Sequence, residues 1–222
     1  MRSHFLATTL ILALPVLALQ AKAADAPIPE LRVEADPSGS VFDVKNVYSQ
    51  PLTAMLIELV DFPDDKYSFT RDDMGPGAIA AGTDKKIRVA NPNPGTAPDH
   101  VKITAAIYAD GETAGAPDKI KHILDLRRGR LENTRAIIQR IEKDQKDGKD
   151  KDAIIADLRQ WATTIVPPPP PGMQPITEPA KTVMRNMVVV SAGQVNTKGI
   201  VEELTQLKKT ESELAASKPT LQ

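Results

Sequence analysis

Hydrophobic and polar residues alternate with a period of two from Leu31 to Ala109. Successive side chains of a β-strand point to opposite faces, so this alternation indicates strands with one buried face. Clusters of Pro, Gly, Asn, Asp and Ser interrupt it about every ten residues and favour turns there. Short strands separated in this way are typical of a β-sandwich, and we predict an immunoglobulin-like one over residues 24–112. Its strands are expected at 31–35, 41–48, 52–60, 66–70, 85–90 and 100–109.

The pattern changes to the period of a helix after Gly115. Pro117 suits the first position of a helix, where its missing N–H costs nothing. One apolar stripe consists of Ile120, Leu124, Leu131, Ile138 and Ile141, and a second of Ile154, Leu158, Trp161 and Ile165. The two stripes predict a helical hairpin over 113–166. Two helices alone cannot bury both stripes well, so we expect them to dock on the sandwich, on later helices or on a second copy of the chain.

A run of prolines follows the second predicted helix. Successive prolines cannot continue a helix and favour the extended polyproline II conformation. We interpret residues 167–177 as a stiff linker, with a ligand for a proline-recognition domain as the alternative. Residues 178–222 are expected to form C-terminal helices, although the hydrophobic run 183–190 is compatible with a helix or a short strand. The predicted fold class is therefore α+β, a sandwich followed by a helical region.

The N-terminal residues have the pattern of a secretory signal peptide. Arg2 supplies a positive charge, Phe5 to Leu19 form an apolar region, and Ala21-Lys22-Ala23 fits a cleavage site. The alternative is a membrane anchor, but this apolar region is shorter than the roughly 20 residues that a bilayer span needs. We therefore predict a signal peptide over residues 1–23 and a periplasmic or secreted protein, with no transmembrane segment after cleavage.

The composition narrows the classes of function. The chain has no cysteine, which excludes disulfides, Cys-ligated metals and nucleophilic cysteine catalysis. Residues 24–116 hold 8 Lys and Arg against 15 Asp and Glu, a net −7, whereas residues 117–160 hold 12 against 9, a net +3. A nucleic-acid-binding protein would carry a strongly basic footprint, so we expect no nucleic-acid partner.

Recognisable catalytic motifs are absent from the sequence, including the P-loop, the Gly-x-Ser-x-Gly elbow and the glycine-rich dinucleotide fingerprint. His100 and His122 form no pair with metal-ligand spacing. We therefore predict that the protein is not an enzyme and has no cofactor, with Ca²⁺ as the alternative. Clustered carboxylates suit Ca²⁺, with solvated acidic turns as the alternative. The candidate ligands are Asp61, Asp64, Asp65, Asp72 and Asp73.

A second candidate site is a basic sector on the first predicted helix. It consists of Arg127, Arg128, Arg130 and Arg135. Arg127 also occupies, with Thr134, a position of the apolar stripe that a hydrophobic residue would normally fill. The sector could bind an anionic polymer, a lipid headgroup or an acidic partner, or dock on the acidic sandwich of the same chain. The alternative is a solvated helix face whose arginines pair with carboxylates at helical spacing.

The segment AAIYADGETAG, residues 105–115, lies where the two periods meet. Asp110 and Glu112 raise the question of a metal or acid–base site, but no histidine or third carboxylate is near them in the sequence. Asp-Gly suits a tight turn, because glycine adopts positive φ without strain. We interpret Asp110-Gly111 as the junction between sandwich and helices, with a role in a site as the alternative.

The runs PLTAMLIELV and VKITAAIYADGETAGAPDKIKHILDLRRGRLE resemble those of uncharacterised exported bacterial proteins. That group has an immunoglobulin-like N-terminal sandwich followed by a helical region, joined at a strand-Asp-Gly-x-x-x-Gly-x-Pro-helix junction. The resemblance covers residues 30 to 140. It implies a fold and no activity, because the shared motifs are structural.

These patterns together favour a non-catalytic exported protein, an interaction or structural module of the envelope or of the secreted fraction. Its partner is expected to be another protein or a second copy, bound through the helical region. One alternative is a carbohydrate- or small-ligand-binding sandwich, which would need exposed aromatic residues such as Tyr67, Phe69 and Tyr108. A further alternative is a Ca-binding or enzyme-accessory protein that uses the acidic loops at 61–73.

Overall fold

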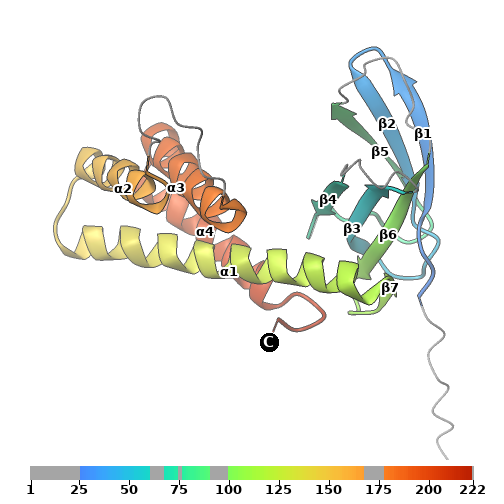
Figure 1. Cartoon of the computed structure of the whole chain (residues 1–222). Helices are drawn as coiled ribbons and strands as arrows, with labels where there is room; N and C mark the ends of the chain where they lie inside the picture. The colour runs from blue at the N-terminus through green and yellow to red at the C-terminus, as the bar shows by residue number, and fades with distance from the viewer. Residues whose placement is uncertain (1–25, 61–67, 75–76, 91–99, 168–177, 222) are drawn as a thin grey trace, which may run out of the picture.

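The structure, a computed structural model, describes residues 26–60, 68–74, 77–90, 100–167 and 178–221. The predicted signal peptide, residues 1–23, and all but the first residue of the predicted linker lie outside these ranges. The described residues form seven strands in two antiparallel sheets, followed by four helices (Figure 1). The predicted α+β class, with strands first and helices after them, is confirmed at this level.

The two sheets divide the strands between them. One has the order β1-β2-β5 and consists of β1 (Glu30–Asp36), β2 (Gly39–Lys45) and β5 (Asp84–Ala90). The other has the order β4-β3-β6-β7 and consists of β4 (Ser68–Asp72), β3 (Leu52–Leu59), β6 (Val101–Tyr108) and β7 (Thr113–Gly115). Six of these strands lie where the alternation predicts them. The short strand β7 was not predicted, because three residues show no recognisable period.

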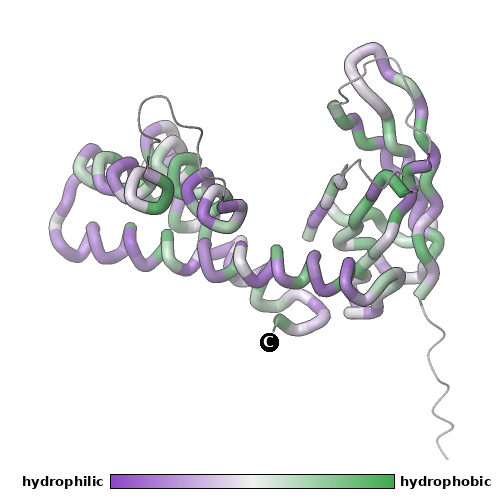
Figure 2. Tube along the Cα trace, in the orientation of Figure 1, coloured by the Kyte–Doolittle hydropathy of each residue, from purple (hydrophilic) through white to green (hydrophobic). Residues whose placement is uncertain are grey.

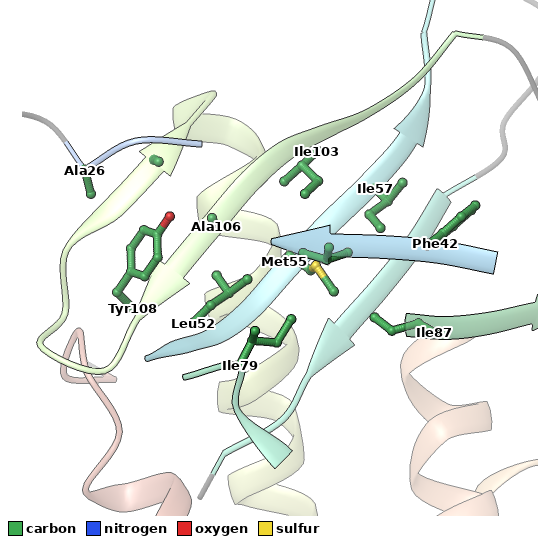
Figure 3. Packing of buried hydrophobic residues seen from close by; sticks show 12 residues of the cluster. Ala26, Phe42, Leu52, Met55, Ile57, Ile79, Ile87, Ile103, Ala106 and Tyr108 are labelled. Atoms are coloured by element: carbon green, nitrogen blue, oxygen red, sulfur yellow. The ribbon is translucent and has the colours of Figure 1, made fainter. Parts of the chain in front are cut away.

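The inner faces of the two sheets pack against each other to form the first hydrophobic core (Figure 3). Phe42 of β2 and Ile87 of β5 face Met55 and Ile57 of β3. Phe42 also makes an edge-to-face contact with Phe69, with ring centroids 6.1 Å apart. This geometry is favourable for aromatic rings, and it adds to the burial of apolar area that holds the sheets together.

The second sheet is buried on both faces, because a helix covers its outer face. The outward-facing residues Ala54 and Leu56 of β3 and Ala105 and Ile107 of β6 pack against this helix. The doubly apolar sequence of β3 therefore reflects a sheet that lies between a second sheet and a helix. Charged residues such as Glu34 and Lys86 lie exposed on the first sheet, where they form an ion pair at 3.3 Å.

The covering helix is α1 (Pro117–Lys146), whose 30 residues make it about 45 Å long. It extends beyond the sheet and joins the sandwich to three further helices (Figure 1). These are α2 (Lys151–Ile165), α3 (Pro179–Lys198) and α4 (Ile200–Ala215). Figure 2 shows α1 as mostly hydrophilic, with hydrophobic residues at intervals along it. This single helix contributes to two separate cores.

The second core lies among the four helices. It includes Ile137, Ile141, Ile154, Leu158, Val188, Val195 and Leu204. Within it α2 packs mainly against α3, and α1 mainly against α4. The predicted hairpin therefore docks on both the sandwich and the later helices. The hydrophobic run 183–190 is helical and forms part of α3, which settles the choice between helix and strand.

Asp110-Gly111 forms the turn between β6 and β7. Gly111 has φ +99°, and the backbone N–H of Glu112 donates to Asp110 Oδ1 at 3.0 Å. The hydroxyl of Tyr48 donates to Asp110 Oδ2 at 3.2 Å, so both carboxylate oxygens have partners within the chain. The tight turn is confirmed, but Asp110-Gly111 lies within the second sheet and not at its junction with the helices. The sheet continues to Gly115, so the helical region begins at Pro117 and not at the predicted residue 113.

Candidate functional site

The arginines of the predicted basic sector lie in different environments in the structure. Arg127 is buried, with 1% of its surface exposed. Its guanidinium donates from Nε to Asp72 Oδ1 at 2.8 Å and from Nη2 to Thr53 Oγ1 at 3.0 Å. Nη1 donates to the backbone oxygen of Lys218 at 3.1 Å. Arg127 therefore connects α1 to β3, to β4 and to the C-terminal tail. Arg127 is therefore not part of an external patch, and its pair with Asp72 matches the interpretation in which the sector docks on the acidic sandwich of the same chain.

Two other arginines of the sector pair within the helical region. Arg128 donates from Nη1 to Asp125 Oδ1 at 2.7 Å, and Arg135 donates from Nε to Glu211 Oε1 at 2.9 Å. Both pairs are partly exposed, so each contributes at most about 1 kcal/mol. The Arg128 contact matches the alternative interpretation of arginines paired at helical spacing, whereas Arg135 pairs with a carboxylate of α4. Arg130 differs, because it has no ion pair among the residues that the structure describes.

The two described residues of the predicted Ca²⁺ site also pair with cations. Asp72 binds the buried Arg127, and Asp73 pairs with Arg71 and, at 3.5 Å, with Lys85. The other predicted ligands, Asp61, Asp64 and Asp65, lie outside the described residues. Within the described ranges no three His, Asp or Glu side chains gather as metal ligands would. Asp72 and Asp73 thus act within the fold as partners of cationic side chains.

A groove lies where α1, α3 and α4 meet. Its volume is about 410 Å³, which is within the range of ligand-binding sites. It is lined by Arg130, Thr134 and Ile137 of α1, by Val183, Asn186, Met187, Val190 and Ser191 of α3, and by Glu203, Leu207 and Thr210 of α4. Each helix contributes residues at spacings of three, four and seven, which place them on one face of that helix. We refer to this feature as the α1–α3–α4 groove.

The walls of the α1–α3–α4 groove expose aliphatic side chains to solvent. Val183 is 47% exposed and Val190 is 60% exposed. Both belong to α3, whose opposite face is buried in the helical core through Val188 and Val195. Single exposed valines are ordinary, but two valines a helical heptad apart that line the same hollow form a contiguous apolar surface.

The floor of the α1–α3–α4 groove carries a buried polar pair. Ser191 Oγ of α3 donates a hydrogen bond of 2.6 Å to Glu203 Oε1 of α4. Both residues are almost fully buried, and burial raises the pKa of the Glu203 carboxyl, with the Ser191 hydrogen bond acting in the opposite direction. This hydrogen bond gives Ser191 Oγ and Glu203 Oε1 a partner within the chain, and Glu203 remains the acidic group of the groove floor.

The sequence pattern did not reveal the α1–α3–α4 groove. Val183, Met184, Met187, Val188 and Val190 all belong to the hydrophobic run 183–190, yet the structure buries only part of this set. The available signal was the width of the hydrophobic face of α3. These residues cover more of the circumference of α3 than a single packing partner can bury, which leaves some of them for another surface.

The two described aromatic residues among those proposed for carbohydrate binding, Phe69 and Tyr108, do not form an exposed row. Tyr108 is fully buried, and its hydroxyl donates to the backbone oxygen of Pro27. Burial raises the pKa of Tyr108 to about 12. Phe69 packs against the sandwich core, and Tyr67 lies outside the described residues. Two of the three candidates therefore serve the fold.

Comparisons with known proteins do not add a function. No protein-family model matches the chain, and searches of curated proteins and of solved structures give no significant match. Among the helices that the structure describes, none is long and apolar enough to cross a membrane. The inference of function therefore depends on the geometry of this chain.

Proposed function

We propose that the protein is a non-catalytic exported interaction module that binds a protein partner in the α1–α3–α4 groove. Export rests on the predicted signal peptide at residues 1–23, which would place the mature protein in the periplasm or outside the cell. The observation that carries the proposal is the exposure of Val183 and Val190 on the wall of the groove. Burying such side chains in an interface is favourable at about 25 cal/mol per Å² of apolar surface.

The sandwich would serve this module as a rigid support. Its strand orders, β1-β2-β5 and β4-β3-β6-β7, are compatible with an immunoglobulin-like arrangement of two antiparallel sheets. The buried contacts of Arg127 fix α1 on the second sheet, so the sandwich and the groove would move as one body. A partner bound in the groove would then be held at a defined distance from the sandwich.

The lining of the groove favours binding over catalysis. Its ionisable side chains are Arg130 at the edge and Glu203 on the floor, and Glu203 already binds Ser191. A hydrolytic site would need a nucleophile activated by a neighbouring base, and that base would have to be held by a third group. Apolar walls with few polar groups are instead typical of protein interfaces.

Site-specific photo-crosslinking in the native envelope and in the secreted fraction tests this proposal. A photoreactive amino acid at position 190 should give a discrete adduct with one partner. The matched control is position 201, because Val201 is 75% exposed on α4 but does not line the groove. Adducts of equal yield at both positions, or none at position 190, would contradict the proposal.

A further inference from the structure

We infer that the partner presents an amphipathic α-helix with an acidic residue, and that this helix packs in the α1–α3–α4 groove as an additional member of the helical bundle. The inference rests on the proposed function and names the chemistry of the partner. It follows from the spacing of the lining residues, from the composition of the floor, and from Arg130, which has no ion pair with any residue that the structure describes.

The spacing of the lining residues matches that of a bundle interior. α1 contributes Arg130, Thr134 and Ile137; α3 contributes Val183, Met187 and Val190; and α4 contributes Glu203, Leu207 and Thr210. Every set has the spacing i, i+4, i+7, which repeats along one face of a helix. Helices in bundles present such faces to one another, and a helix in a groove is recognised through the same positions. Three faces of this kind around one hollow suit a helix better than an extended segment.

Arg130 indicates the charge of the partner. The other arginines of α1 have carboxylate partners within the chain: Asp72 for Arg127, Asp125 for Arg128, Glu211 for Arg135 and Asp157 for Arg140. Arg130 has none among the described residues, and it is the arginine that lines the groove. A carboxylate on the incoming helix would give Arg130 an ion-pair partner like those of the other arginines of α1. Charge complementarity of this kind selects the partner and its orientation more than it adds affinity.

The floor of the groove accepts an apolar helix face. Thr134 and Ser191 are small, and Thr134 Oγ1 already donates to the backbone oxygen of Arg130 at 2.8 Å. Ser191 is hydrogen bonded to Glu203. Thr134 and Ser191 thus keep partners within the chain when aliphatic side chains cover them, so we expect the partner to present aliphatic residues at i, i+3, i+4 and i+7.

Fluorescence anisotropy with designed peptides tests the inference on the full mature chain. The first probe is an amphipathic helical peptide with a leucine stripe flanked by glutamates. The second carries lysines in place of the glutamates, the third has the first composition in scrambled order, and the fourth interrupts the helix with prolines. We expect the glutamate helix to bind about twofold to fivefold more tightly than the lysine helix, the size of one partly exposed ion pair. The scrambled and proline-containing peptides should not bind measurably.

Charge reversal at the groove provides the decisive comparison. Arg130→Glu should reverse the preference in favour of the lysine helix, whereas Arg135→Glu, on the same helix but outside the groove, should leave the preference unchanged. Equal binding of the scrambled peptide, or a preference that does not respond to Arg130→Glu, would overturn the inference. In that case crosslinks at position 190 but not at 201 would still support the proposed function.

A second copy of the chain is the other occupant that the experiment must separate. Light scattering across a concentration series measures the molar mass of the mature protein. A constant monomer mass is expected. A dimer that Val190→Asp converts to monomer would show that the groove binds a second copy, and it would overturn the inference of a separate helical partner.

Discussion

Arg127 and Arg130 lie three residues apart on α1, yet the first is buried and the second is exposed. Arg127 is buried and reaches Asp72, Thr53 and the backbone of Lys218. Arg130 is exposed at the edge of the α1–α3–α4 groove and has no ion pair among the described residues. The first residue belongs to the contact between α1 and the sheet, which we call the α1–sheet junction. The second belongs to the surface where α1 meets α3 and α4.

The difference shows which of the two surfaces already makes its contacts within the chain. At the α1–sheet junction, Glu58 accepts hydrogen bonds from Lys119 at 2.7 Å and from Thr104 at 2.6 Å, while apolar residues of α1 and the sheet fill the space between. At the α1–α3–α4 groove, valines face solvent and Arg130 has no ion pair within the described part of the chain. Contacts of the first kind form on folding. A surface of the second kind gains contacts when a partner binds.

Removing the buried arginine should have the largest effect. Arg127→Ala leaves the carboxylate of Asp72 at the junction without its cation and should lower the free energy of unfolding by about 3–5 kcal/mol. Urea denaturation monitored by circular dichroism measures this change. The loss follows from an uncompensated charge, in addition to the cavity that the missing side chain leaves.

Two variants separate this cause from a general weakness of α1. Arg128→Ala removes a partly exposed pair with Asp125 and should cost no more than about 1 kcal/mol. The double variant Arg127→Met, Asp72→Leu removes both charges and should recover much of the lost stability. Equal losses for Arg127→Ala and Arg128→Ala would show that the burial of Arg127 does not matter.

Two glycines extend the comparison to the backbone. Gly115 has φ +106°, and an added Cβ would lie 2.1 Å from the backbone oxygen of Thr104. Gly115→Ala should therefore destabilise the protein by about 3 kcal/mol, through strained φ and overpacking. Gly129 lies within α1, where an added Cβ has nothing within 4 Å. Gly129→Ala should stabilise the protein by about 0.5–1 kcal/mol, because alanine favours a helix. Thermal unfolding measures the shift of Tm for each variant. Shifts of the same sign for both variants would contradict this interpretation.

Much of the fold could be predicted because its elements depend on local patterns. Alternation located six strands, and Pro117 marked the start of α1 at the residue where the helix begins. The second apolar stripe predicted α2 because its residues are buried against α3. These features follow from the periods of strands and helices, which a single chain displays without knowledge of its contacts.

The candidate site could not be predicted because it depends on which helices meet. Arg127 and Arg130 occur within the same four residues, RRGR, so composition alone does not distinguish the buried arginine from the exposed one. Arg127 did stand out as a charged residue in an apolar stripe, and that position was the available evidence for its burial. The valines of α3 likewise gave no sign of which would be buried, since this depends on where α1 and α4 pack.

The far end of α1 provides an intermediate case between the two arginines. Arg140 binds Asp157 of α2 through two hydrogen bonds, of 2.6 and 3.0 Å, and Lys149 binds the same carboxylate at 3.0 Å. The hydrogen bond from Arg140 lowers the pKa of Asp157 to about 2. The stabilisation that this provides is present above pH 3.8, the ordinary pKa, and is lost as pH falls through the folded-state value.

Asp157→Asn should therefore lower the free energy of unfolding at pH 7 by about 1–2 kcal/mol, an effect reduced by the partial exposure of Arg140. The difference from the wild type should disappear near pH 2. Urea denaturation at pH 7, 4 and 2.5 measures it. A difference that stays constant over this range would show that the ion pair is not its source.

The smallest effect is expected on the floor of the groove. Burial raises the pKa of Glu203, so the folded protein binds its proton more tightly than the unfolded chain does. The stabilising contribution of the protonated form is present below pH 4.5, the ordinary pKa, and is lost as pH rises through the raised folded-state value. Glu203→Gln cannot ionise and keeps an acceptor for Ser191. It should therefore raise Tm at pH 7 by about 1–2 °C.

The pH dependence distinguishes this cause from a change in packing. The gain in Tm from Glu203→Gln should shrink as pH falls towards 4, because the wild-type carboxyl is then protonated as well. Glu211→Gln, which removes the exposed partner of Arg135, serves as the control and should show no gain at pH 7. If the gain for Glu203→Gln were equal at pH 4 and pH 7, ionisation on the groove floor would not be its cause. A gain confined to neutral pH would show that the groove, unlike the α1–sheet junction, contains a charge for which the fold provides no full compensation.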